Sequence, residues 1–342
     1  MIHRPLRRRA LMTALAAATL AAAIPAGASA AEAVDLGVLR LTSHAPSFIA
    51  YERGYFRDEG LDVTMQFFEA AQPMSVAVAA GDVDYGMTAI TGGLISLAEK
   101  GALKVIGGAL SESPGVPGAM ILASNAAYAD GLTDPSKIAG RSFGTTTAGS
   151  SFHYMLNKVA EANHIPMADI RMRPLQKVGA IVGALTSGQI DGWIIQPSIG
   201  NGLVAEGHAK KIGDFNAIDP NYQVTVVFSS AAMAKDQRAT TEAFLRALAR
   251  GAHDYNAAFV DHSADAAEIA ALDGIVHKYV QEDLPDADFA QMMATTSMRI
   301  NDGLALSMGS ITDQLEWFKR EGMVSPDITS ETLVDSSFVQ SR

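Results

Sequence analysis

The segment over residues 38–68 constrains the fold of this chain more than any other. An apolar run, Val38–Leu41, predicts a strand and leads into the polar loop Thr42–Pro46, whose proline suits the first turn of a helix. Apolar spacing predicts that helix over residues 46–54, and the alternation of residues 61–68 predicts a second strand. A strand-helix-strand opening with hydroxyl side chains after the first strand is typical of an open α/β sheet. Such sheets bind ligands at the carboxyl ends of their strands.

The same alternation continues along most of the chain. Strands are expected near residues 36–42, 61–68, 83–87, 104–109, 141–145, 170–174, 190–195 and 210–213, and the β-branched run over 223–228 is expected to be a return strand. Helices are expected near residues 46–54, 72–80, 90–100, 149–163, 176–187, 198–206, 240–259, 264–281, 286–296 and 311–321. This order predicts parallel strands joined by crossover helices, and therefore the α/β class with two doubly wound lobes. We expect lobe one over residues 34–121, lobe two over 122–224, and a return to lobe one with C-terminal helices over 225–342.

A short internal repeat supports two related lobes. Residues 79–87 read A-A-G-D-V-D-Y-G-M, and residues 186–194 read T-S-G-Q-I-D-G-W-I. In both, a glycine suited to end a helix is followed by an aspartate and a short strand. Asp84 and Asp191 are therefore expected to be structural, and Trp193 to lie in the core.

The N-terminal segment has the order of a secretory signal. Residues 1–30 contain four arginines and no acidic residue, then an alanine-rich apolar stretch, and they end in Ala28-Ser29-Ala30. We expect cleavage near Ala30 and export to the periplasm as a soluble protein, since the chain has no cysteine for lipid attachment. The pair Arg8-Arg9 fits a twin-arginine signal as well as an ordinary one, and both routes stay open.

The loop over residues 145–152, T-T-T-A-G-S-S-F, is the strongest candidate for ligand binding. It follows an expected strand and opens an expected helix, so that hydroxyls, backbone N–H groups and the positive end of the helix dipole meet there. We expect Thr145, Thr147, Ser150 and Ser151 to bind ligand. Thr147 or Ser150 is also expected to cap the helix.

Three further segments lie at the carboxyl ends of predicted strands. Ser43 and His44 end the first strand, Thr88 and Thr91 follow the strand of the first repeat, and Gln196 follows the strand of the second. We expect these side chains to face the ligand, with capping by Thr88 or Thr91 as the alternative role. Aromatic residues expected near the rims of the cleft are Phe48, Phe152, Trp193, Tyr222 and Phe228.

Charge and composition narrow the ligand class. The loops over residues 42–46, 88–92 and 145–151 contain no lysine or arginine, whereas a doubly charged phosphate normally takes an arginine clamp. A monoanion or a neutral polar compound, with an aromatic or heterocyclic ring as one option, is therefore expected. The formal net charge of −11 disfavours nucleic acid. The eight histidines lack metal-site spacing, and no thiol or nucleophile elbow is present, so we expect neither a metal, nor another cofactor, nor catalysis.

The run from Ala50 to Val63, A-Y-E-R-G-Y-F-R-D-E-G-L-D-V, resembles the nitrate/sulfonate/taurine family of ABC-transporter solute-binding proteins. The resemblance extends over residues 34–230. It implies a type II periplasmic binding protein fold with a hinge between the lobes and C-terminal helices packed on lobe one. It also implies a monomer that captures a small organic sulfonate or carboxylate and delivers it to an inner-membrane permease. Gln196 departs from the acidic residue that many members carry before the following proline, so a cationic substrate is not implied.

Two other classes remain open on the sequence. A ligand-sensing module for a membrane sensor kinase would share every feature described above. An enzyme on the same scaffold, similar to the thiamine-pyrimidine synthases or to chorismate-type dehydratases, is less consistent with the chain. The synthases need a cysteine-rich motif, and the dehydratases lack a secretion signal.

Overall fold

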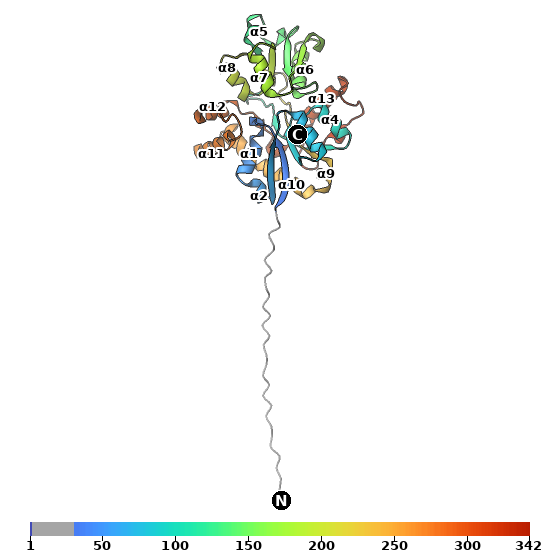
Figure 1. Ribbon diagram of the computed structural model, residues 1–342. Helices are drawn as coiled ribbons and strands as arrows, with labels where there is room; N and C mark the ends of the chain where they lie inside the picture. The colour runs from blue at the N-terminus through green and yellow to red at the C-terminus, as the bar shows by residue number, and fades with distance from the viewer. Residues whose placement is uncertain (2–30) are drawn as a thin grey trace. The chain divides into compact units, whose positions relative to one another are not determined.

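A computed structural model describes Met1 and residues 31–342, so the export signal expected over residues 1–30 lies almost wholly outside the described residues. Two five-stranded sheets, each flanked by helices, organise residues 31–342 (Figure 1). The expected α/β alternation is confirmed by the order of these elements. Within this range no helix has the length and apolar character needed to cross a membrane.

The first sheet has the strand order β2-β1-β3-β11-β4. These strands are β2 (Leu61–Phe67), β1 (Glu32–Val38), β3 (Tyr85–Thr88), β11 (Val226–Ser230) and β4 (Leu103–Gly108). Strand β1 runs parallel to β2 and β3, whereas β11 runs antiparallel to both of its neighbours.

The second sheet has the order β10-β6-β9-β7-β8. These strands are β10 (Ala209–Asp214), β6 (Met120–Ser124), β9 (Gly192–Ile195), β7 (Ser142–Thr145) and β8 (Arg171–Pro174). Strand β7 is parallel to β8 and β9, and β6 is antiparallel to β9 and β10. The sequence did not predict β6. In the first sheet, the strands expected to be parallel, β1 to β4, do run in one direction, and β11, expected as a return strand, runs against them.

The helices follow the expected order with small shifts at their ends. On the first sheet lie α1 (Ala45–Glu52), α2 (Tyr55–Asp58), α3 (Ala71–Ala80) and α4 (Gly92–Glu99). On the second lie α5 (Asn125–Ala129), α6 (Ser151–Ala162), α7 (Val178–Thr186) and α8 (Pro197–Ala205). Within residues 31–342, five 3₁₀ turns complete the order: η1 (Thr42–His44), η2 (Pro135–Lys137), η3 (Met167–Asp169), η4 (Phe215–Ala217) and η5 (Asp302–Leu304). We keep the names lobe one and lobe two for the parts built on the first and the second sheet.

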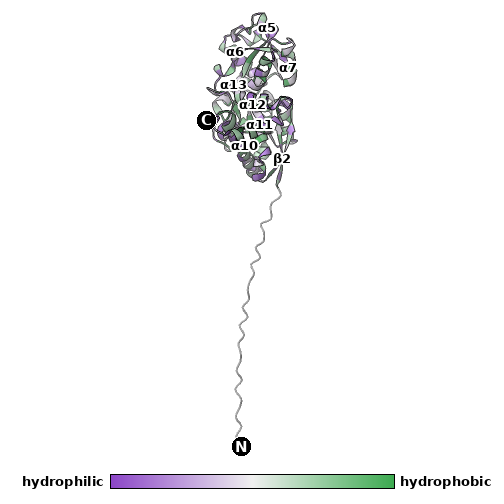
Figure 2. Cartoon of the chain, turned by 90° about the vertical axis from the view of Figure 1, so that its left-hand side faces the viewer, coloured by the Kyte–Doolittle hydropathy of each residue, from purple (hydrophilic) through white to green (hydrophobic). Residues whose placement is uncertain are grey.

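The C-terminal region is helical. It comprises α9 (Ala231–Asp236), α10 (Arg238–Phe259), α11 (Ala266–His277), α12 (Asp286–Thr296), α13 (Met308–Arg320) and α14 (Ser330–Leu333). Helices α10, α11 and α12 carry both hydrophilic and hydrophobic residues, as amphipathic helices do (Figure 2). Helix α10 crosses α1 so closely that a Cβ on Gly251 would lie 2.2 Å from the carbonyl oxygen of Pro46. This contact places α10 on lobe one, as expected for the C-terminal helices.

Helix α13 differs from that expectation, because it packs on both lobes. Tyr154 of α6 donates a hydrogen bond to Asp313 (2.5 Å), and Lys158 pairs with the same carboxylate (3.1 Å). The ring of Trp317 packs edge-on against Tyr154 at 5.3 Å, while Phe318 approaches Gly92 at the start of α4. The helix therefore connects α6 of lobe two with α4 of lobe one.

Two crossings join the lobes, one over residues 110–119 and one over residues 215–225. Strand β5 (Leu110–Ser111) begins the first crossing and pairs with β12 (Arg299–Ile300). The two crossings also pair with each other, since the backbone N–H of Glu112 donates to the carbonyl of Tyr222 (2.9 Å). The domain ranges 34–121, 122–224 and 225–342 stay a prediction.

Candidate ligand-binding cleft

A cavity of about 80 Å³ lies where the two lobes and the two crossings meet. Lobe one and the crossings contribute Leu39, Leu41, Ser43, His44, Ala70, Ala71, Thr88, Ala89, Leu110, Ala119, Val224 and Thr225 to the lining. Met298, which precedes β12, also lines the cavity. Those of lobe two are Thr146, Ser150, Ser151, Phe152, Met155, Val178, Ile195 and Gln196. Because a single water needs roughly 10–15 Å³ of such space, the cavity has room for several waters or a compact organic group.

His44 forms the polar wall on the lobe one side. It belongs to η1, and its side chain is buried. Its Nε2 donates to the carbonyl of Met87 (2.5 Å), so its Nδ1 accepts from the Ser43 hydroxyl (3.2 Å). Burial lowers the pKa of His44 to about 4, against a weaker opposing effect of the Met87 hydrogen bond. The imidazole is therefore neutral at neutral pH and adds no positive charge to the cavity.

The opposite wall is the start of α6. Ser150 occupies the N-cap position and is 2% exposed, yet its side chain makes no capping bond. Its Oγ finds no hydrogen-bond partner anywhere in residues 31–342, although the residue lines the cavity. The predicted capping by Thr147 or Ser150 was wrong: the Gly149 N–H donates instead to Nδ1 of His153 (3.1 Å). The Ser150 hydroxyl is therefore left available to a group inside the cavity.

Six of the predicted site residues line the cavity together: Ser43, His44, Thr88, Ser150, Ser151 and Gln196. Three others do not. Thr145 is fully buried within β7, and Thr147 is half-buried outside the lining, whereas Thr146 between them does line it. Thr91 caps α4 by accepting from the Leu94 N–H (3.1 Å), the alternative role expected for it.

Most apolar residues that line the cavity were not predicted from the sequence to belong to the site. Leu110 and Val224 lie on the two crossings, and Met298 immediately precedes β12. Among the five expected aromatic residues only Phe152 lines the cavity; Phe48, Trp193, Tyr222 and Phe228 are fully buried elsewhere. One local signal was available, because Val224 belongs to the β-branched run over residues 223–228 that predicts a strand.

Among the residues that the structure describes, no lysine, arginine, aspartate or glutamate belongs to the lining. The polar atoms are hydroxyls, one neutral imidazole and the amide of Gln196. Within residues 31–342, no three histidine, aspartate or glutamate side chains lie close enough together to hold a metal ion. Chemically, the cavity can accept or donate hydrogen bonds and bury an apolar group, without a charged side chain in contact.

Direct contacts between the lobes close both sides of the cavity. On one side, Thr42 and Ser198 share a hydrogen bond between hydroxyls (2.9 Å), and Gln196 donates to both (3.3 and 3.0 Å). On the other side, the Gly92 N–H donates to the carbonyl of Gly149 (3.0 Å). The structure is therefore a closed arrangement of the lobes.

Comparison with known proteins agrees with this architecture. Residues 41–258, more than half of the chain, match the family described as NMT1/THI5 like. The chain belongs to the NMT1/THI5-like family. No curated protein sequence matches it.

Several solved structures are similar in fold to this NMT1/THI5-like protein. The alkanesulfonate-binding protein SsuA from Xanthomonas axonopodis pv. citri, bound to MOPS, superposes with a TM-score of 0.70 at 17% identity, covering 89% of this chain and 98% of that one. The periplasmic nitrate-binding protein NrtA from Synechocystis PCC 6803 gives 0.68 at 14% identity, covering 88% and 83%. The desulfurization enzyme DSZB gives 0.60 at 12% identity, covering 90% and 97%. At these identities the matches establish the periplasmic binding protein fold.

Proposed function

We propose that this NMT1/THI5-like protein is the solute-binding component of an ABC importer and captures a small organic monoanion between its lobes. The observation that carries the proposal is the orphaned Ser150 hydroxyl, which is buried, lines the cavity and lies at the start of the twelve-residue helix α6. A buried hydroxyl without a partner costs free energy that a bound acceptor would restore.

The start of α6 suits a sulfonate or carboxylate group. The first N–H groups of an α-helix have no partner within the helix, and the helix dipole favours negative charge there. Ser150 and Ser151 add hydroxyl donors from the same turn, and Thr88 faces them from lobe one. No charged side chain competes, so one negative charge, rather than two, matches the donors present.

The remaining lining fits the organic part of the ligand. Phe152, Met155, Val178 and Ile195 form an apolar wall on lobe two, and Leu110 and Val224 extend it across the crossings. Burying apolar surface contributes about 25 cal/mol per Å². The proposed ligand therefore has a compact apolar or ring-shaped body attached to its anionic group.

The side chains of the lining support binding rather than catalysis. His44 has both nitrogens engaged and is neutral, so it is not available as a base without breaking its bond to Met87 or Ser43. No lining carboxylate or thiol is present to act as acid, base or nucleophile. Export to the periplasm as a monomer and docking on an inner-membrane permease complete the proposal, in keeping with the names of SsuA and NrtA among the structural neighbours.

A ligand screen tests this function directly. Thermal shift of residues 31–342 would be measured with alkanesulfonates including MOPS, aromatic carboxylates, nitrate and pyrimidines. We expect an organic monoanion to raise the melting temperature and dianions such as sulfate to fail. Stabilisation only by uncharged pyrimidines, or steady conversion of a bound compound into product, would contradict the proposal.

The hit would then be titrated calorimetrically against two matched variants. Ser150→Ala removes the orphaned hydroxyl, and we expect it to weaken binding about ten- to a hundredfold, the value of a hydrogen bond to a charged group. Thr147→Ala removes a hydroxyl three residues away that does not line the cavity, and it should leave the affinity unchanged. If both variants bound the ligand with equal affinity, the anionic group would not be bound at the start of α6.

A further inference from the structure

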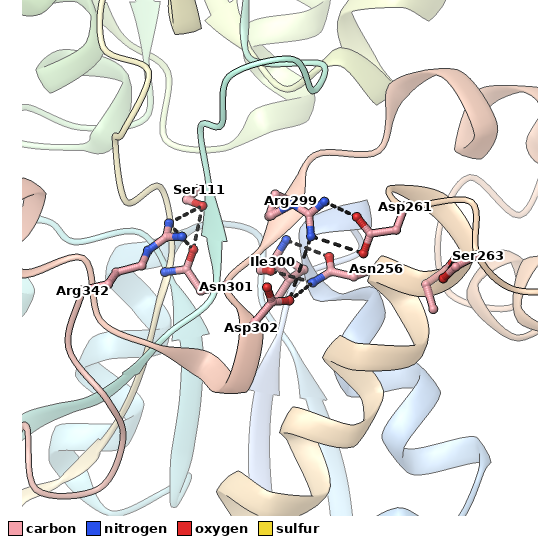
Figure 3. Close-up of polar contacts among 10 residues, drawn as sticks. Ser111, Asn256, Asp261, Ser263, Arg299, Ile300, Asn301, Asp302 and Arg342 are labelled. Carbon is pink, nitrogen blue, oxygen red and sulfur yellow. Dashed lines mark hydrogen bonds and ion pairs between the residues drawn. The ribbon is translucent and has the colours of Figure 1, made fainter.

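Arg342, which is itself exposed, hydrogen-bonds to a group of buried polar side chains beside the two crossings (Figure 3). The guanidinium donates through Nε to the Ser307 hydroxyl (2.9 Å). Through Nη2 it donates to Ser111 Oγ (3.2 Å) and Asn301 Oδ1 (2.6 Å). Ser111 is 1% exposed and Asn301 is fully buried, so the guanidinium group reaches deep side-chain oxygens.

This network connects both crossings between the lobes. Ser111 lies in β5, at the start of the first crossing. Asn301, which Arg342 contacts, donates through Nδ2 to Gln223 Oε1 (2.8 Å) in the second crossing. Gln223 in turn donates to the carbonyls of Leu110 (3.2 Å) and Thr225 (2.8 Å). Ser111 also donates directly to Asn301 Oδ1 (2.7 Å), so Arg342 adds two hydrogen bonds to a network that links the crossings.

The cavity lies directly against these groups. Leu110, Val224 and Thr225 line it, and they are the sequence neighbours of Ser111 and Gln223. The Thr225 hydroxyl also accepts a hydrogen bond from the Leu110 N–H (2.9 Å). A change in the spacing of the crossings would therefore move the cavity wall as well as the angle between the lobes.

The contacts of Arg342 differ from those of Arg299, which lies in the same view (Figure 3). The half-buried Arg299 pairs with the carboxylates of Asp261 and Asp302. Among the described residues, the side-chain acceptors of Arg342 are neutral oxygens only. Hydrogen bonds from a charged donor are stronger than neutral ones, and the planar guanidinium fixes the direction of each. This geometry suits the alignment of two segments better than the neutralisation of a buried charge.

We propose that Arg342 is a positioning residue of the hinge, whose contacts with Ser111 and Asn301 favour the closed arrangement of the lobes. The proposal rests on the proposed function, because it assumes that the lobes open and close around a ligand. Its test needs no ligand, so the two can fail independently.

Spin labels on the two lobes measure the opening. The natural chain has no cysteine, so Val76→Cys on α3 and Thr186→Cys on α7 would carry the only labels. Both positions are exposed. Each helix starts at the cavity, because Ala71, the first residue of α3, and Val178, the first residue of α7, both line it. Pulsed electron-electron resonance on the unliganded protein then gives the distance distribution between the lobes.

In the labelled background, we expect Arg342→Ala to reduce the closed-to-open population ratio by about fivefold or more, the usual size of a coupling of this kind. Arg342→Lys keeps the charge but cannot contact Ser307 and Asn301 together through a planar fork, so it should shift the ratio in the same direction by less. The matched control is Arg238→Ala. Arg238 also holds the C-terminal segment through Ser337, but it contacts neither crossing, and its loss should leave the ratio unchanged.

Three results would overturn the proposal: unchanged distributions in both Arg342 variants, a shift toward closure, or the same shift in Arg238→Ala. The Lys variant keeps the test valid if the Ala variant melts at a much lower temperature. The proposed function is tested separately by the ligand screen, and if no screened compound binds, that function fails while the comparison of Arg342 variants still stands.

Discussion

His44 shows how one buried side chain sets the electrostatic character of the cavity. Its ring faces the space where ligand is proposed, but both nitrogens are already bonded and burial disfavours its charged form. His153, which accepts the Gly149 N–H at the opposite wall, is also buried, and burial lowers its pKa to about 4. The two histidines nearest the cavity are therefore structural hydrogen-bonding groups, and an anion must be recognised without them.

The lowered pKa values of these two histidines predict how the stability of the protein changes at acid pH. A histidine whose pKa is lowered on folding stabilises the native state above the unfolded pKa near 6.5, and that stability is lost as the pH falls toward 4. We expect the NMR resonances of His44 and His153 to show no titration above pH 5, and the free energy of unfolding to decrease between pH 6.5 and 4. The same resonances in urea-unfolded protein, titrating near 6.5, are the control. A native His44 midpoint near 6.5 would show that the ring is not buried as described.

The residues of the site that could be predicted are those whose position follows from local sequence. Ser43, Ser150 and Gln196 follow strands and Thr88 ends one, and the carboxyl ends of strands meet at one edge of a sheet. Thr145 does not line the cavity, whereas Thr146 does, since successive side chains along an extended chain face opposite sides. Leu110 and Met298 carry no local signal, because only the folded crossings bring them to the cavity.

At the scale of elements, the internal repeat has a common hydrogen-bonding role. The Asp84 carboxylate accepts from the Asp35 N–H (2.8 Å), and the Asp84 N–H donates to the Asp35 carbonyl (3.0 Å). Asp191 makes the same two contacts with the backbone of Ser142 (2.7 and 2.9 Å). In each lobe, an aspartate joins the start of one strand to its neighbour.

We therefore predict that Asp84→Ala and Asp191→Ala act alike. Each removes an acceptor from a half-buried backbone N–H and should lower the free energy of unfolding by about 1–3 kcal/mol, as measured by urea denaturation. Binding of the screened ligand, where the variant is folded, should change little because neither residue lines the cavity. Asp82→Ala is the control, because Asp82 is exposed two residues away. A loss of affinity without a loss of stability would assign these aspartates to the site instead.

The directions of the strands mark the limit of sequence reasoning about elements. Helix-strand alternation was readable because a strand, a crossover helix and the next strand in one sheet are almost always parallel. Strands β6 and β11 enter their sheets straight from a crossing between the lobes, so that rule does not apply to them. Their antiparallel pairing depends on where the chain arrives in space, which neighbouring residues do not encode.

At the scale of the whole molecule, the crossings and α13 connect the two lobes. Glu112, in the first crossing, is 1% exposed. One of its carboxylate oxygens accepts from the Ala119 N–H (2.9 Å), and the other has no hydrogen-bond partner among the described residues. Burial raises the pKa of Glu112 to about 7, with smaller contributions from the charges of Asp219 and Asp214. The buried hydroxyl of Tyr222, from the second crossing, lies in the same environment and is also unpartnered among these residues.

The sign of the resulting pH effect is opposite to that of the histidines. The Glu112 carboxylate binds its proton more tightly in the native state than in the unfolded chain, where its pKa is near 4.5. Its contribution to stability is therefore present below pH 4.5 and is lost as the pH rises to about 7. We expect Glu112→Gln, which cannot ionise, to flatten the decrease in the free energy of unfolding over that interval by roughly 2–3 kcal/mol.

Urea unfolding of the parent and variant at pH 5, 6, 7 and 8 measures this difference between slopes. The slope is the informative quantity, because an amide at position 112 leaves an N–H group unpaired and lowers stability at every pH. Glu99→Gln, at an exposed position of α4, changes the net charge equally and should leave the slope of the parent intact. If Glu112→Gln and Glu99→Gln gave the same slope, the carboxylate of Glu112 would have to be solvated, and the tight pairing of the two crossings around it would be wrong.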